Sequence, residues 1–167
     1  MRGSAVGQGS PSAVLPSANT TALLGLAYMK LGHRIVEGVV SAGYPQRPAH
    51  SAVFAHIDVE AGTRLSTLAA RANITPQAMG ELVDDLERLN YVVRRPDPDD
   101  RRAKRIILTK RGRESVVVAQ RTIAHIETDL ETLVGAEDLA LVHRALQRII
   151  AEDDLGASET HTDEREP

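Results

Sequence analysis

The sequence has no cysteine and no tryptophan, and its aromatic residues are one Phe and three Tyr. Without cysteine, disulfides, thiolate metal sites and a thiol-based redox switch are all excluded. So few aromatic rings argue against a protein that stacks the bases of single-stranded nucleic acid. The apolar interior must therefore consist mainly of Leu, Ile, Val and Ala, as in packed helices.

Long apolar runs are also missing, since none approaches the roughly 20 residues that span a bilayer. The first 17 residues are rich in Gly, Ser, Ala and Pro and lack the apolar block of a signal peptide. The chain carries no phosphate-binding loop, nucleophile elbow or clear metal-ligand spacing. We therefore expect a cytoplasmic protein without membrane contact that is not an enzyme and has no cofactor or metal.

The formal net charge of −3 hides an uneven distribution. Residues 88–113 contain ten Lys or Arg and three Asp, whereas residues 151–167 contain seven acidic residues and one Arg. The local field near a surface decides where phosphates bind, so the basic stretch is compatible with a DNA-binding protein.

Apolar residues recur at three- and four-residue steps over residues 19–42, 48–59, 110–134 and 136–151. This spacing predicts four helices. The stripes on the first and the last two helices look too extended for the core of a chain of 167 residues. They predict a homodimer that buries them.

Two short helices and a hairpin are predicted between the long helices. Ser66 is a good N-cap for a helix over 67–72, and Thr75 with Pro76 starts a second helix that ends near Leu89. Asn73 and Asn90 suit the left-handed backbone that ends a helix. Residues 91–95 and 104–109 are β-prone and flank a turn-forming cluster, which predicts a two-stranded hairpin.

Helix, turn, helix and hairpin is the order of a winged helix-turn-helix, so the expected fold is mainly α with a small β-hairpin wing. The start of the second helix would lie in the major groove, where Gln77 could pair with adenine and Ala78 could contact a thymine methyl. Arginines of the wing would enter the minor groove, and Asp100 would orient one of them. The predicted DNA-binding residues are Ser66, Thr75, Pro76, Gln77, Ala78, Glu81, Arg94, Arg95, Arg101, Arg102 and Lys104.

The stretch 65–112 resembles the MarR family of transcriptional regulators. The matching segments are LSTLA from Leu65, TPQAM from Thr75, LVDDLE from Leu82, DPDDRRAK from Asp97, and Leu108-Thr109 with Gly112. Asn90 is a departure, because the family usually has Gly there. The resemblance implies a homodimer on a pseudo-palindromic operator, released by small anionic or aromatic ligands.

We divide the chain into a disordered segment 1–18, a MarR-type domain 19–152 and an acidic disordered tail 153–167. Within the domain, 19–45 and 110–152 would form the dimer, and about 48–109 the winged helix-turn-helix. His33, Tyr44 and His50 are candidate ligand-binding residues, although packing or helix-end roles explain them as well. The expected function is a ligand-released repressor. The alternative is a constitutive regulator or architectural DNA-binding protein without an effector, and an enzyme with an accessory winged helix is disfavoured.

Overall fold

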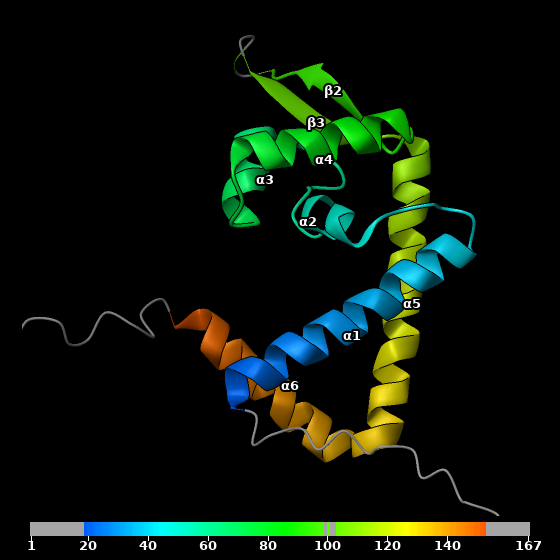
Figure 1. Cartoon of the computed structure of the whole chain (residues 1–167), viewed down its shortest axis with the longest axis vertical. Helices are drawn as coiled ribbons and strands as arrows, with labels where there is room; N and C mark the ends of the chain where they lie inside the picture. The colour runs from blue at the N-terminus through cyan, green and yellow to red at the C-terminus, as the bar shows by residue number, and fades with distance from the viewer. Residues whose placement is uncertain (1–18, 99, 101–102, 153–167) are drawn as a thin grey trace, which may run out of the picture.

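The computed structural model describes residues 19–98, 100 and 103–152. The predicted disorder of 1–18 and 153–167 and the roles of Arg101 and Arg102 lie outside the described residues. Figure 1 shows two parts, a small lobe with the β-hairpin and an arm of long helices.

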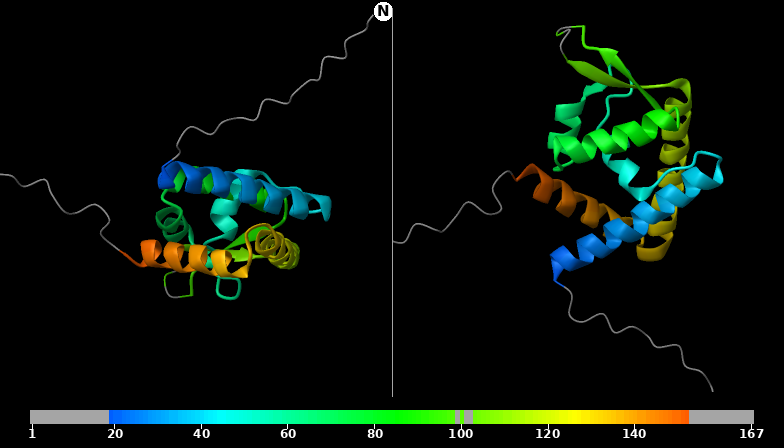
Figure 2. Two further views of the ribbon diagram at one scale, coloured as in Figure 1. Left: turned by 90° about the horizontal axis from the view of Figure 1, so that it is seen from below. Right: turned by 45° about the horizontal axis from the view of Figure 1, so that its top comes forward.

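The arm consists of α1 (Thr20–Ser41), α5 (Lys110–Val134) and α6 (Ala136–Ala151). Asn19 and Thr109 cap α1 and α5 with their side chains, and Gly135 at φ +88° separates α5 from α6. Helix α1 crosses α5, and α6 folds back from the end of α5 (Figures 1 and 2). Among the described helices, none is long and apolar enough to span a bilayer.

The lobe consists of short elements around one apolar core. They are η1 (Pro48–His50), α2 (Ser51–Phe54), β1 (Thr63–Arg64), α3 (Leu65–Arg71), α4 (Pro76–Arg88), β2 (Val92–Pro96) and β3 (Lys104–Leu108). The strands form an antiparallel sheet in the order β1-β3-β2. The core comprises Val53, Ile57, Leu68, Ala69, Met79, Val83, Leu86, Tyr91, Val92, Ile106 and Leu108. The predicted mainly α fold with a β-hairpin wing is therefore confirmed.

Strand β1 is not among the elements that the sequence predicts. Gly62 has φ +69°, and a Cβ built on it would lie 2.6 Å from the carbonyl oxygen of Ile106. The lack of a side chain lets the backbone approach β3 closely enough for Thr63 and Arg64 to pair with it. A two-residue strand has no periodicity that a sequence can reveal.

Two helix predictions need correction. The helix expected over 48–59 is a 3₁₀ turn followed by α2, which ends at Phe54; Asp58 then accepts the backbone N–H groups of Glu60 and Ala61 in a turn. Ser66 is not an N-cap, because α3 already begins at Leu65.

The other local predictions are confirmed. The hydroxyl of Thr75 accepts the N–H of Ala78 at 3.1 Å, and Pro76 is the first helical residue of α4. Asn73 and Asn90 have positive φ, at +52° and +61°. The chain therefore turns where its sequence indicates on both sides of α4.

Candidate functional site

The first turn of α4 is presented to solvent. Thr75, Pro76, Gln77 and Glu81 are exposed and Ala78 is half-buried, whereas Met79, Val83 and Leu86 anchor the opposite face in the core. The first turn contains no acidic residue. Ser66 is exposed on α3. The start of α4 can therefore offer short polar groups and backbone N–H groups to an anionic surface.

The wing adds exposed cations beside this helix start. Strands β2 and β3 pair from Val92 with Leu108 to Pro96 with Lys104, and Arg95 and Lys104 are exposed. The N–H of Ala103 donates to the carbonyl oxygen of Asp100 at 2.9 Å, which closes the hairpin tip. The orienting role of the Asp100 side chain stays a prediction.

Arg94 faces α4 instead of open solvent. Its guanidinium donates to Asp84 at 2.6 Å and to Glu87, and its backbone N–H donates to Glu87 at 3.1 Å. Only 22% of its side chain is exposed. Arg94 therefore ties β2 to α4 and neutralises two carboxylates, a role different from the predicted DNA contact.

Asp97 is the orienting residue that sequence reasoning missed. Its carboxylate is fully buried and accepts hydrogen bonds from Nε of Arg64 at 2.7 Å and Nε of Arg105 at 2.9 Å. These bonds fix the base of the wing to both β1 and β3. The hairpin register places Arg105 near Asp97, but Arg64 comes from the strand that the sequence did not predict.

The three predicted ligand residues do not come together. His33 is exposed on α1 and pairs with Glu37 at 3.1 Å. The hydroxyl of Tyr44 donates to Glu114 at 3.4 Å, and Arg111 lies over its ring. His50 is buried beneath α4. Each of the three lines a different surface depression, and their role in ligand binding stays a prediction.

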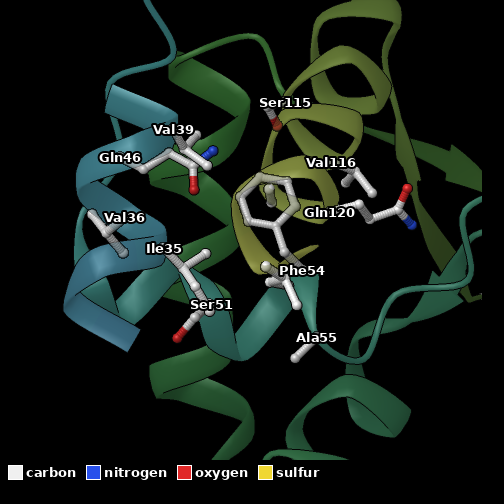
Figure 3. Close-up of a pocket in the computed structure, with 12 residues that line it drawn as sticks. Ile35, Val36, Val39, Gln46, Ser51, Phe54, Ala55, Ser115, Val116 and Gln120 are labelled. Carbon is white, nitrogen blue, oxygen red and sulfur yellow. The ribbon is translucent and has the colours of Figure 1, made fainter. Parts of the chain in front are cut away.

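An apolar cavity of about 260 Å³ does lie between the arm and the lobe (Figure 3). Helices α1, α2 and α5 and the chain before η1 contribute its walls. The lining residues are Ile35, Val36, Val39, Gln46, Ser51, Phe54, Ala55, Ser115, Val116, Ala119, Gln120 and Ile123. Sequence reasoning missed them because a mostly aliphatic lining has the same pattern as a packed core.

The described residues include no cluster of three His, Asp or Glu side chains that could hold a metal. The buried His50, for example, contacts the backbone of Arg47 and one carboxylate, that of Asp85. The backbone N–H of Arg47 donates to its Nδ1 at 3.2 Å, and its Nε2 lies 3.7 Å from Asp85 without a hydrogen-bond partner. Burial lowers the pKa of His50, which favours the neutral ring. Because Nδ1 accepts the hydrogen bond from Arg47, the proton of the neutral ring is assigned to Nε2.

Comparison with solved structures finds several regulators of the same fold. The CouR repressor bound to a 23-mer DNA duplex is 26% identical, with a TM-score of 0.61 over 81% of this chain and 98% of that chain. CouR from Rhodococcus jostii RHA1 bound to p-coumaroyl-CoA is 25% identical, with a TM-score of 0.62 over 80% and 92%. Apo MarR from E. coli is 18% identical and shows the fold, with a TM-score of 0.66 over 80% and 98%.

No curated protein sequence matches the chain. Residues 47–103, which hold the lobe from the start of η1 to the wing, match the sequence model of the MarR family. The family match covers the helix-turn-helix and the first strand of the wing, and the structural matches extend the likeness to the long helices. Residues 47–103 are therefore similar to the MarR family of transcriptional regulators, and the described chain has the fold of solved regulators of this kind.

Proposed function

We propose that the chain is a homodimeric repressor that binds duplex DNA through α4 and the wing and releases it when a small aromatic or anionic ligand enters the apolar cavity. The observation that carries the DNA-binding part is the exposed start of α4 beside the basic wing, with no acid in its first turn. The CouR structure with the same fold is described as bound to a DNA duplex.

The electrostatics of α4 support this placement. Its second half carries Asp84, Asp85 and Glu87, which would repel phosphates if they were unpaired. Arg94 pairs with Asp84 and Glu87, while Arg47 and Arg88 pair with Asp85. With these acids neutralised, Gln77 and Ala78 are proposed to read bases, and Arg95, Lys104, Arg101 and Arg102 to contact phosphates and the minor groove.

The arm supports dimer formation. Large apolar side chains remain exposed along α1, the end of α5 and α6, including Tyr28, Met29, Leu133, Leu141 and Ile150. Exposed apolar surface of this extent on three helices of one chain is typical of an interface between subunits. A dimer through 19–45 and 110–152 would bury it and fix the distance between the two copies of α4.

The cavity supports ligand release. It is lined mostly by aliphatic side chains and Phe54, with Gln46, Ser51, Ser115 and Gln120 as polar groups that could orient a ligand. Its 260 Å³ would hold a small aromatic ring with a short substituent. One CouR structure of this fold is described with p-coumaroyl-CoA, which carries such a ring. His33, Tyr44 and His50 are not part of this proposal.

The test is a titration of labelled duplex from the DNA flanking the chain's own coding region, read by fluorescence anisotropy at several salt concentrations. Each phosphate neutralised contributes a slope of about −0.9 in log K against log salt. Arg95→Ala and Lys104→Ala should each reduce the slope by about 1. Gln77→Ala should instead reduce the discrimination between bases at one base pair by about 1–3 kcal/mol of binding free energy. The salt slope should stay unchanged. A salt-independent affinity would refute the DNA-binding proposal.

A constitutive regulator without an effector is the second candidate function. It shares the DNA-binding residues and differs only in the use of the cavity. Calorimetry with a panel of phenolic acids and p-coumaroyl-CoA, with and without the duplex, separates the two. Reciprocal coupling between ligand and DNA supports release, and binding that ignores DNA favours the constitutive regulator.

A further inference from the structure

The segment 46–51, which contains the short helix η1, runs from the wall of the cavity to α4. Gln46 and Ser51, which flank its ends, line the cavity. Arg47 and His50, which belong to the same turn, reach Asp85 of α4. The residues that line the cavity here are therefore direct neighbours in sequence of the side chains that contact α4.

Asp85 is the meeting point of these contacts. It is about four-fifths buried, and its carboxylate pairs with the guanidinium groups of Arg47 and Arg88. Arg88 belongs to α4 itself, so among the described residues the ion pairs that link Asp85 to another segment are those with Arg47 and His50. The hydroxyl of Tyr91 also holds this segment, because it donates to the carbonyl oxygen of Pro45 at 3.0 Å.

The contact between His50 and Asp85 is incomplete in this structure. The side chain of His50 is 1% exposed, and its Nε2 has no hydrogen-bond partner although Asp85 is 3.7 Å away. An N–H···O bond forms at about 2.9 Å, so a relative shift of η1 and α4 by less than about 1 Å would complete it. A buried donor without a partner costs free energy, so this contact is sensitive to small movements of η1 against α4.

We propose that Arg47, His50 and Asp85 form the coupling contact that transmits occupancy of the apolar cavity to α4. An occupant that presses on Gln46 or Ser51 moves η1, and η1 moves α4 through Asp85. Arg47, His50 and Asp85 are positioning residues, because they lie outside both the cavity lining and the exposed start of α4. The inference rests on the proposed function, since it specifies how release occurs.

Asp84 provides a matched control. It is the neighbouring residue on α4 and also forms an ion pair, but its partner is Arg94 of β2, and η1 is not involved. Asp84→Asn and Asp85→Asn therefore remove the same charge from the same helix. Only the second variant breaks the connection to η1.

The absence of native cysteine allows an occupant to be attached without a known ligand. We would introduce Ala119→Cys in the cavity wall on α5 and modify it with benzyl methanethiosulfonate, using methyl methanethiosulfonate as the small control. Ala55→Cys, an exposed position of the cavity lining at the end of α2, is the second attachment site. Affinity for the labelled duplex is measured before and after modification in chains with Asp85, Asp85→Asn, Asp85→Glu or Asp84→Asn.

The benzyl group should weaken DNA binding about 10-fold when Asp85 is present, within the usual range of allosteric coupling. The same modification should change affinity less than about 2-fold in Asp85→Asn, whereas Asp84→Asn and Asp85→Glu should respond like the parent. Circular dichroism reports whether each variant folds. If Asp85→Asn does not fold, Arg47→Gln makes the same comparison from an exposed side chain.

Equal weakening in Asp85 and Asp85→Asn chains would show that the signal takes another route and would overturn this inference alone. An unmodified parent that does not bind the duplex would contradict the proposed function itself. A parent that binds DNA and ignores the benzyl group at both attachment sites would refute ligand release and the coupling contact together.

Discussion

The lobe and the arm differ in where their apolar side chains are buried. The lobe encloses eleven buried apolar residues from helices and strands that are close in sequence. The arm has almost no closed core: Val39 and Ile126 are buried, while Leu133 and Ile150 are more than three-quarters exposed. One chain completes the lobe, whereas the arm needs a second surface to cover it.

The largest expected effect tests the closed core of the lobe. Leu86 is fully buried on α4, and Leu86→Ala should lower the free energy of unfolding by about 2–5 kcal/mol because it leaves a cavity. The measurement is urea denaturation followed by circular dichroism. Leu133→Ala is the matched control, with a change below about 0.5 kcal/mol at concentrations where monomers dominate. Equal losses would contradict the contrast between lobe and arm.

The second prediction tests the open face of the arm. Leu141 of α6 is 57% exposed, and Leu141→Asp would place an unpaired charge in the proposed dimer interface. The dimer dissociation constant should rise at least about 100-fold, while the lobe keeps its fold. Sedimentation equilibrium measures this constant. A parent chain that is monomeric at micromolar concentration would contradict the interface.

The third prediction concerns the junction of the two parts. A Cβ on Gly112, in the first turn of α5, would lie 2.1 Å from the carbonyl oxygen of Tyr91. Because that neighbour is a backbone atom, Gly112→Ala should lower the free energy of unfolding by about 1–3 kcal/mol. This loss exceeds the stabilisation expected from the higher helix propensity of Ala. Gly25→Ala on α1, where a Cβ meets no atom within 4 Å, is the control. In thermal unfolding, Gly112→Ala should have a clearly lower Tm than Gly25→Ala.

The smallest expected effect is a pH dependence that arises within the lobe. Burial lowers the pKa of His50 in the folded chain, so the unfolded chain binds the proton more strongly. Stability should therefore be complete above about pH 6.5 and fall as the pH drops from there toward the folded pKa, by at most about 1.4 kcal/mol per pH unit. His50→Gln should flatten this part of the profile.

Denaturation at several pH values measures the profile, with His125→Gln on the exposed face of α5 as the control. A parent profile that stays flat below pH 6.5 would show that His50 is not buried as a neutral ring in solution.

Sequence reasoning succeeded where a local rule was sufficient. Thr75 caps α4, and Asn73 and Asn90 take positive φ because their side chains tolerate it. It failed where the outcome depended on a distant partner. Ser66 has the chemistry of a cap, yet α3 begins one residue before it, directly after Arg64 pairs with β3.

The candidate site shows the same division at the level of charges. The pattern identified the basic stretch of the wing, but it could not assign a partner to each cation. Arg94 was expected on DNA and is bound to α4, while Asp97 was overlooked and holds Arg64 and Arg105. Ion pairs over such separations depend on how strands and helices are placed, which no residue spacing reveals.

By itself, the sequence determined the order of the helices, the turns between them and the presence of a basic hairpin, because capping, periodicity and backbone preference act over a few residues. Only the tertiary structure decided that β1 completes the sheet, that the segment around η1 runs from the cavity wall to α4, and that His33, Tyr44 and His50 lie apart. Those outcomes depend on packing between segments distant in the chain, where shape and burial choose the partners.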